Sequence, residues 1–504
     1  MDRSANNMQS IPEDRNTSFN SQSIVSTLTK DFSAPNFMGW YLANTLDNVS
    51  KASIDMFMPI FARVIGASAV EIGLLSGLYT LINISQLIWA QLSSKLGQSR
   101  IFVVLGWLVS ALLFIPMLLV KKGQIFLLLV LRFLQGFFTS AAAPTQASLM
   151  ADHIPQDKRA NKVNNFTKLG LIGALVGTIC GGLLFSFLAD VFRLTVDLTF
   201  IILFFWTMVL GVIASIIFFI SVPDYKYLDR LDPVILTQRS IIHSEITSKT
   251  RLINRYKAYK TKFENFLVLC LFAGIFYFAV NMAAPFFIIL EIEYYNFSFF
   301  QASLLTSINT FTQMVLASLL ARTEMLDKYG RKVSLVIGVL LVSLSTVLVV
   351  IPYYLNVSPY LWCIFAWVIL GISWGIFNPS ISVFILDIAH PKYRATLIAT
   401  YNTLTGITMF LGPIIGGVII DFTQNITLTF LIRALIVILT LIVLVRIKEP
   451  VIPASLIHPP RYYFTKLLRY SAGRGPEPLL IQVIPQKLRK KHWFGIRQRI
   501  KRSN

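Results

Sequence analysis

Long apolar segments alternate with short polar loops along most of this chain. A helix that spans the hydrocarbon core of a bilayer needs about 20 residues, most of them apolar. The pattern predicts twelve such segments, at residues 37–62, 70–91, 101–120, 124–150, 164–188, 197–221, 264–290, 297–320, 333–352, 358–384, 395–420 and 427–447. Only helices and closed barrels satisfy their backbone groups in lipid, and the segment lengths favour helices. We therefore expect an all-α integral membrane protein with twelve transmembrane helices.

The composition supports the same class. Of the 504 residues 55% are hydrophobic and only 14% are charged, which is more apolar surface than one water-soluble core can bury. The three cysteines, Cys180, Cys270 and Cys363, lie inside apolar segments, where cysteine behaves as a small hydrophobic residue. The sequence therefore predicts no disulfide framework.

A stretch that begins at Gly136 recurs later in the chain. Eight residues reappear 235 positions downstream without a gap: Gly136, Pro144, Asp152, Arg159, Ala160, Gly177, Gly181 and Gly182 correspond to Gly371, Pro379, Asp387, Arg394, Ala395, Gly412, Gly416 and Gly417. Such repeats in long apolar segments are typical of transporters. We predict two pseudo-symmetric six-helix bundles, at 37–221 and 264–447, with a disordered tail at 1–36, a basic loop at 222–263 and a basic tail at 448–504.

The charges predict how the chain is oriented. Lys and Arg concentrate in the loops after the second, fourth, eighth and tenth segments, so the positive-inside rule places both termini in the cytoplasm of a plasma-membrane protein. The first 35 residues lack the basic-then-apolar pattern of a cleavable signal, so we expect the first helix to direct insertion. Most of the net charge of +21 lies in the central loop and the C-terminal tail. We expect the tail to bind anionic lipid rather than nucleic acid.

Several motifs resemble the major facilitator superfamily over residues 37–447. They are the loop Leu326-Asp327-Lys328-Tyr329-Gly330-Arg331-Lys332, the run Arg132-Phe133-Leu134-Gln135-Gly136 and the glycine-rich fifth segment. The first two segments are similar to the drug:proton antiporter branch, through Met58-Pro59-Ile60-Phe61, Gly66-Ala67-Ser68 and Glu71-Ile72-Gly73-Leu74-Leu75. The resemblance implies a major facilitator fold and transport by alternating access.

The basic loops are candidates for a cytoplasmic gate. Gly97 and Gly330 suit tight turns because glycine has no Cβ. The resemblance implies that Asp327 and Arg331 lock the gate, with Lys332 beside them. The alternative is that the basic residues only anchor the topology at the membrane surface.

The chain departs from the family pattern at two places. The first-half loop has Ser94 and Gln98 where the family has aspartate and arginine. The Gly-Pro step that marks antiporters in the fifth helix is absent from Gly177-Thr178 and occurs instead at Gly412-Pro413. Antiport and symport therefore both stay open.

The first segment carries three charges in a single stripe. Asp47, Lys51 and Asp55 are spaced four residues apart, so they share one helix face. A charge at membrane depth costs about 2.5–3.5 kcal/mol, and such residues seldom face lipid. Asp55 and Arg132 lie at similar distances from the outer ends of their segments, which predicts an ion pair between them.

Two interpretations of this stripe are open. In the functional one, a carboxylate takes and releases a proton while Arg132 changes partners and shifts the pKa of that carboxylate. The resemblance implies the same role for Arg132. In the structural one, Asp47, Lys51 and Asp55 form a permanent ladder of paired charges that holds the first helix against the fourth.

Glycines in the fifth and eleventh segments predict close helix packing. Small residues at one-turn spacing allow a neighbouring helix to approach closely. The set is Gly177, Gly181 and Gly182 in one segment and Gly412, Pro413, Gly416 and Gly417 in the other.

Polar and aromatic residues in other segments are candidates for lining a substrate cavity. They are Tyr79, Asn83, Gln86, Gln135, Asn281, Asn309, Gln313, Trp374, Asn378, Tyr401 and Asn402. Each is also compatible with a simple interhelical hydrogen bond. As a set they favour an uncharged or cationic amphipathic compound over a polyanion, which would need several arginines.

Enzyme function finds little support in the sequence. There is no glycine-rich phosphate loop that ends in Lys-Ser/Thr, and the five histidines lack metal-ligand spacing. We expect no cofactor and no metal, a small-molecule substrate, H⁺ as the coupling ion, and a monomer. The main hypothesis is proton-coupled efflux. The alternatives are a proton-coupled symporter that takes up a sugar or organic acid, and a receptor or scaffold on the same fold.

Overall fold

The computed structural model describes residues 36–80, 82–96, 99–153, 156–223, 249–323, 330–355, 357–388 and 394–447. Helices and turns make up these ranges, and no strand occurs in them. The predicted tails, much of the central loop, Gly97 and Asp327 lie outside the described residues, and so does the Asn83 side chain.

The first six predicted segments correspond to helices in the same order along the chain. They are α2 (Phe37–Asp55), α3 (Met58–Val64), α4 (Ala69–Thr80), α5 (Ile82–Leu96), α6 (Ser99–Leu112), α7 (Phe114–Leu118), α8 (Ile125–Thr139), α9 (Ala142–His153), α10 (Gln156–Ser186), the π-helix η1 (Phe187–Val191) and α11 (Val196–Ser221).

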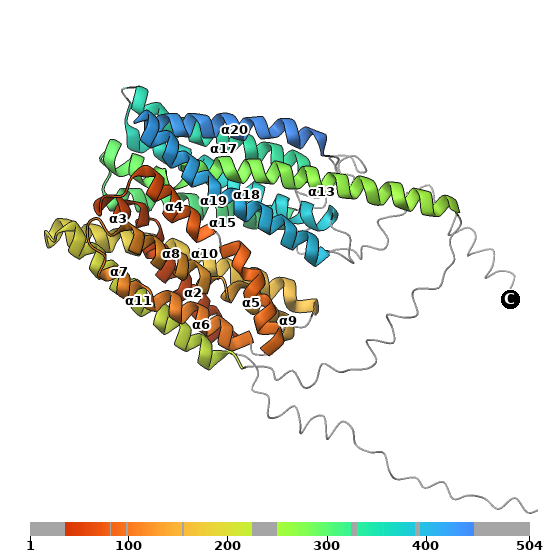
Figure 1. Cartoon of the computed structure of the whole chain (residues 1–504), viewed down its shortest axis with the longest axis horizontal. Helices are drawn as coiled ribbons and strands as arrows, with labels where there is room; N and C mark the ends of the chain where they lie inside the picture. The colour runs from red at the N-terminus through yellow and green to blue at the C-terminus, as the bar shows by residue number, and fades with distance from the viewer. Residues whose placement is uncertain are drawn as a thin grey trace, which may run out of the picture. The chain divides into compact units, whose positions relative to one another are not determined.

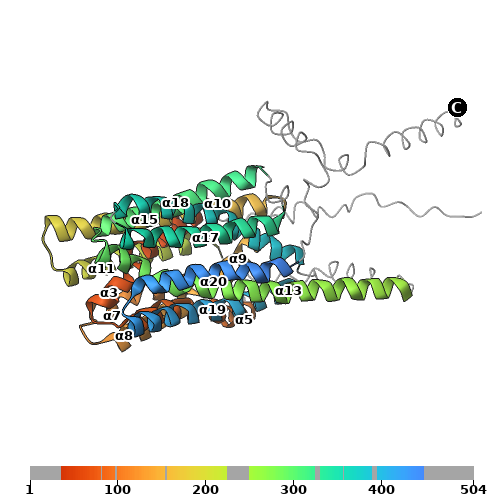
Figure 2. The same ribbon diagram turned by 90° about the horizontal axis from the view of Figure 1, so that it is seen from above.

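The last six segments correspond to helices that are mostly longer and less interrupted. They are α13 (Lys249–Ala283), η4 (Ala284–Phe286), α14 (Phe287–Ile289), η5 (Leu290–Tyr294), α15 (Phe299–Thr323), α17 (Arg331–Tyr354), α18 (Pro359–Ile388), α19 (Arg394–Thr423) and α20 (Ile426–Arg446). The longest, α13, runs as one continuous helix of 35 residues, drawn in green in Figure 2.

Ten helical segments in the described chain are long and apolar enough to cross a membrane. The first two predicted spans are not among these ten, and they are broken into α2 and α3 and into α4 and α5. The third and fourth spans are among the ten, although each is also interrupted, between α6 and α7 and between α8 and α9. The break before α3 has a local cause, because Pro59 stands at the start of α3 and has no backbone N–H to continue the ladder from α2. The interruption leaves α2 as a helix of 19 residues.

The described chain forms two compact units. The first contains the described parts of residues 1–248 together with 277–310 and 402–430, and the second contains those of 249–276, 311–401 and 431–504. The first unit therefore includes segments from both sequence repeats. Within it α2 packs against α10 and α11, as Figure 1 shows, and in the second unit α17 packs against α18.

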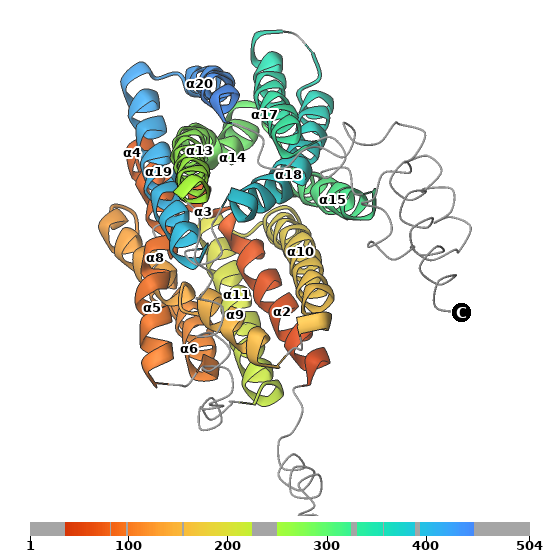
Figure 3. The same cartoon turned by 90° about the vertical axis from the view of Figure 1, so that its right-hand side faces the viewer.

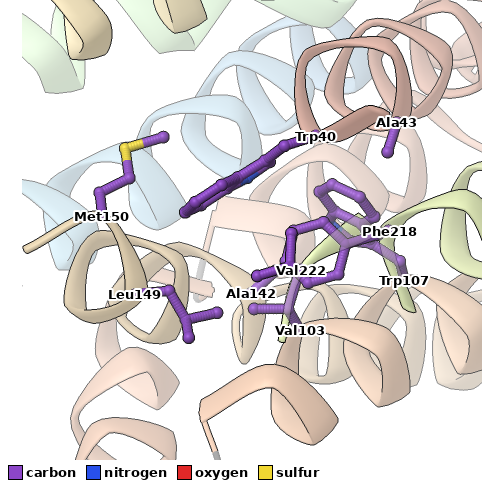
Figure 4. Packing of buried hydrophobic residues seen from close by; sticks show 9 residues of the cluster. All are labelled: Trp40, Ala43, Val103, Trp107, Ala142, Leu149, Met150, Phe218 and Val222. Carbon is purple, nitrogen blue, oxygen red and sulfur yellow. The ribbon is translucent and has the colours of Figure 1, made fainter. Parts of the chain in front are cut away.

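An aromatic cluster anchors α2 in the first unit. The buried side chains of Trp40, Trp107 and Phe218 meet there, and Phe218 packs edge-on against both tryptophans at centroid distances of 6.0 and 5.1 Å. Figure 4 shows these rings together with Val103 of α6 and Val222, which directly follows the end of α11. Aromatic pairs of this geometry contribute about 0.5–1.5 kcal/mol beyond their buried area. The cluster fixes the rotation of α2 and hence the direction of its charged face.

The glycines of α10 lie directly against the backbone of α2. A Cβ added at Gly177 or Gly181 would come closer than 3.0 Å to the carbonyl oxygen of Val49 or Ser53. Ser53 also donates a hydrogen bond from Oγ to the carbonyl of Gly177, at 3.1 Å. The small residues thus bring the two helices into backbone contact.

The equivalent glycines of α19 pack in the same way on α13. Gly412 and Gly416 face the carbonyl oxygens of Phe278 and Met282, also too closely for a Cβ. The two repeats therefore share a helix-packing device as well as a sequence pattern. The other two glycines of the set, Gly182 and Gly417, face Ser303 and the carbonyl of Ala69.

Candidate functional site

The charged stripe on α2 lies on a face of the helix that other parts of the protein largely cover. The Lys51 Nζ atom is 2.6 Å from Asp47 Oδ2, and the Asp47 side chain is 9% exposed. Lys51 also lies 5.7 Å from the centroid of the Trp107 ring on α6, a cation–π distance. The buried carboxylate of Asp47 therefore has its positive partner on the same helix, one turn away.

Asp55, at the end of the same stripe, pairs with a different helix. Arg132 on α8 places Nη2 2.8 Å from Asp55 Oδ1. The Arg132 side chain is 6% exposed, whereas that of Asp55 is 31% exposed. The structure thus contains the pair expected from matched depth, with one buried member and one partly exposed member.

Two further contacts hold the Arg132 guanidinium. Nη1 donates a hydrogen bond of 2.5 Å to Oε1 of Gln135, one turn farther along α8. The guanidinium also stacks 4.1 Å from the centroid of the Tyr79 ring on α4. A planar guanidinium can satisfy a carboxylate, an amide oxygen and an aromatic face at once, which a lysine cannot.

Gln135 is itself oriented by α6. Its Nε2 donates to the carbonyl oxygen of Ser110 at 3.3 Å, and Thr139 donates to the hydroxyl of Ser110 at 2.9 Å. This amide orientation leaves Gln135 Oε1 free to face Arg132. Trp107 supports Lys51 and Ser110 supports Gln135, and neither residue was predicted from the sequence. Their spacing of three residues, which places them on one face of α6, could have indicated a shared role.

The charged stripe has no equivalent in the second repeat. Gly177 contacts Val49, and its duplicate Gly412 contacts Phe278, so Val49 and Phe278 are equivalent positions. By the same offset, the positions equivalent to the stripe residues Asp47, Lys51 and Asp55 are Phe276, Val280 and Ala284. The position 235 residues after Arg132 is Trp367. The two repeats thus share the glycine packing, whereas at these positions only the first repeat has the charged residues that form the ion pairs.

The cavity candidates are divided between the two units. Tyr79, Gln86, Gln135, Asn281, Asn309 and Asn402 belong to the first, and Gln313, Trp374, Asn378 and Tyr401 belong to the second. In the first, Tyr79 and Gln135 contact Arg132, whereas Asn281 donates to the Tyr277 carbonyl of its own helix and Asn402 is exposed. The carbonyl Oδ1 of Asn309 is buried and accepts no hydrogen bond from the described residues.

In the second unit Trp374 is half-buried at the edge of an aromatic cluster. Its ring meets Phe276 at 6.1 Å and Phe377 at 5.9 Å, both edge-on, and these two phenylalanines stack at 4.2 Å. The ring therefore has an apolar backing and a partly exposed face.

The predicted gate residues lie at the start of α17. Gly330 has a φ of +94°, a conformation that favours glycine. Arg331 pairs with Asp387 on α18, with Nε 3.1 Å from Oδ2, and Lys332 donates to the carbonyls of Val445 and Ile447 at the end of α20. Asp387 is one of the duplicated residues, but it was not predicted from the sequence to be part of the gate.

Broken and continuous spanning helices, paired packing glycines and an internal charge network define a multi-pass helical membrane protein built from two repeats. The sequence model of the Major Facilitator Superfamily matches residues 40–294 and 269–493. The chain belongs to this family, and it is a membrane transporter of the major facilitator type.

Relatives named for drug resistance match part of the chain at low identity. A multi-drug resistance efflux pump PmrA homolog from Lactococcus lactis is 23% identical over 380 residues, which are 73% of this chain and 83% of the relative. A bicyclomycin resistance protein homolog from Haemophilus influenzae is 27% identical over 139 residues, which are 27% of this chain and 34% of the relative.

Solved structures share the fold. A POT family transporter in complex with 5-aminolevulinic acid has a TM-score of 0.63 at 14% identity, covering 82% of this chain and 96% of that one. The nucleoside transporter NupG has a TM-score of 0.62 at 14% identity, covering 82% and 98%. At this identity the likeness concerns the fold alone.

Proposed function

We propose that the protein is a secondary transporter that couples proton entry to the export of an amphipathic, drug-like compound. One observation supports the proton assignment: the carboxylate of Asp55, whose side chain is 31% exposed, is paired with the buried guanidinium of Arg132. A carboxylate that water reaches can exchange protons, whereas its partner is held in place by α8 and α4. Asp55 is therefore the proton-exchanging group and Arg132 the group that responds.

The contacts suggest how proton binding changes the site. A proton on Asp55 removes the negative charge that faces Arg132, and a buried cation without a counter-charge is unfavourable. Asp47 is already bound to Lys51 on the same face. Protonation of Asp55 therefore favours a rearrangement of α2 against α8 in which charges find new partners, and release of the proton restores the observed pair.

The surroundings of the pair favour an amphipathic cargo. Tyr79 places an aromatic ring against the Arg132 guanidinium, with 4.1 Å between the guanidinium and the ring centroid. Aromatic faces bind flat apolar groups and organic cations. The names of the relatives from Lactococcus lactis and Haemophilus influenzae, a multi-drug efflux pump and a resistance protein, support the same class of cargo.

Proteoliposomes that contain a pH-sensitive dye test this function. We expect a lipophilic cation to elicit a proton signal opposite to its own movement, and Asp55→Asn and Arg132→Ala to abolish that signal. Asp197→Asn is the matched control, because Asp197 is an exposed acid at the start of α11, away from the stripe.

The outcomes separate the proposed function from its alternatives. Proton movement in the same direction as a sugar or organic acid would identify a symporter. Unchanged flux in Asp55→Asn would refute the proton assignment, and absence of flux for every compound would leave a receptor or scaffold role. We further propose a plasma-membrane location with both termini cytoplasmic, which protease accessibility of a C-terminal tag in intact cells tests.

A further inference from the structure

The first turn of α4 is capped from a distant part of the chain. Asp421, near the end of α19, accepts hydrogen bonds from the backbone N–H groups of Ala69 and Val70, each at 3.0 Å, one through Oδ1 and the other through Oδ2. More than 350 residues separate the partners. A carboxylate at a helix N-terminus is favourable because the first amides lack partners within the helix and the helix dipole attracts negative charge.

The local sequence leaves these two amides for Asp421. Ser68 and Glu71 form a capping box, in which Glu71 accepts from the Ser68 N–H at 2.8 Å and Ser68 Oγ accepts from the Glu71 N–H at 3.2 Å. The box satisfies the amides of residues 68 and 71, and those of residues 69 and 70 point to Asp421. The cap is therefore completed by residues from both repeats.

Small residues bring α4 and α19 close enough for this contact. A Cβ added at Gly73 would meet the carbonyl of Pro413, and one added at Gly77 would meet that of Phe410. From the other side, Gly417 faces the carbonyl of Ala69. Figure 3 shows α4 and α19 side by side.

Other contacts between the repeats occur at the same end of the helices. Arg63 Nε lies 3.4 Å from Glu293 Oε1, but these side chains are 51% and 34% exposed, and exposed ion pairs contribute little. Phe185 on α10 stacks on Phe299 of α15 at 3.7 Å. Among these contacts the Asp421 cap is the one that combines charge with two aligned hydrogen bonds.

We propose that Asp421 is the latch of a gate at the end of the spans away from the basic loops. The cap forms while α4 and α19 are in contact and breaks when the two repeats separate at this end. This inference rests on the transporter role in the proposed function, with a site that opens to each side of the membrane in turn, and does not depend on Asp55 or on the cargo. Loss of the latch shifts the equilibrium toward the state that is open at this end.

Spin-label distances test the latch. Labels at Leu119→Cys and Phe422→Cys, both highly exposed positions at this end, report the separation of α7 from α19 once Cys180, Cys270 and Cys363 are replaced by serine. We expect Asp421→Ala to raise the ratio of long to short distances about fivefold, the effect of removing a typical helix cap. Asp421→Asn keeps one acceptor oxygen and the size of the side chain, so it should give a smaller shift in the same direction.

A matched variant serves as the control. Glu293→Gln removes the exposed ion pair at the same end of the helices without touching the α4 cap, so it should leave the distances unchanged. Unchanged distances in Asp421→Ala and Asp421→Asn, with thermal unfolding like that of the parent, would overturn the latch. An equal shift in Glu293→Gln would also overturn it, because any contact at this end would then serve.

The two proposals fail separately. Intact proton flux in Asp55→Asn together with a shifted distance distribution in Asp421→Ala would remove the proton assignment and keep the latch. Loss of flux in Asp55→Asn with unchanged distances in both Asp421 variants would do the reverse.

Discussion

Arg132 on α8 and Asp55 on α2 form an ion pair with 2.8 Å between Nη2 and Oδ1, although 77 residues separate them in sequence. Arg132 is buried and has two more contacts, with Gln135 and Tyr79, so its position does not depend on Asp55 alone. The Asp55 side chain is more exposed than that of Arg132, 31% against 6%. The pair is therefore asymmetric, with a buried cation that has several partners and a more exposed carboxylate.

Replacement of Arg132 by lysine tests whether the shape of the cation matters. A lysine ammonium keeps the charge but cannot contact Asp55, Gln135 and the Tyr79 ring at once. We expect Arg132→Lys to lower proton-coupled flux by about tenfold, the effect of losing one charge-assisted contact of about 1.4 kcal/mol. The measurement is the initial rate of dye response in proteoliposomes at equal protein content. Full activity in Arg132→Lys would show that charge alone suffices.

The Asp47–Lys51 pair predicts a non-additive effect on stability. Lys51→Met leaves the buried carboxylate of Asp47 without its cation, and breaking a buried pair in this way costs about 3–5 kcal/mol. Asp47→Asn combined with Lys51→Met removes both charges and should recover most of that loss. Thermal unfolding in detergent of the parent, the two single variants and the double variant measures the coupling. Additive losses would mean that the two side chains stabilise the protein independently.

The glycine contacts predict which small residues accept a side chain. Gly177→Ala places a Cβ against the backbone of Val49, where neither partner can rotate away, so we expect a loss of about 1–3 kcal/mol. Val176→Ala is the control, because Val176 is the adjacent residue and is 43% exposed. Unfolding temperatures of the two variants provide the comparison. Equal small effects would indicate that α2 and α10 can separate without cost.

Much of the fold was accessible from the sequence because membrane insertion obeys local rules. Each apolar segment is recognised from its own residues, and the described residues of these segments are helical in the structure. The match to the family model confirms the family that the motifs predicted. The break between α2 and α3 was not predicted, although Pro59 lies at that position. The residues on both sides of the break are apolar, so the hydropathy pattern continues across it. Hydropathy does not detect a missing backbone hydrogen bond.

The candidate site was only partly accessible. The four-residue spacing of Asp47, Lys51 and Asp55 identified a charged face, and depth suggested Arg132 as a partner. The depth of a residue in the membrane does not give the rotation of its helix. The contact of Tyr79 with Arg132 and that of Trp107 with Lys51 therefore could not be predicted from the sequence.

The sequence by itself determined the apolar segments, the duplication and the residues that share a helix face, because each depends on spacing along one segment. Only the tertiary structure decided which faces meet. Examples are the cap that Asp421 forms on α4, the ion pair of Arg331 with Asp387, and the hydrogen bond from Gln135 to the Ser110 carbonyl. These contacts depend on the rotation and offset of helices distant in sequence. Packing of the whole set of helices decides both quantities, and no single segment encodes them.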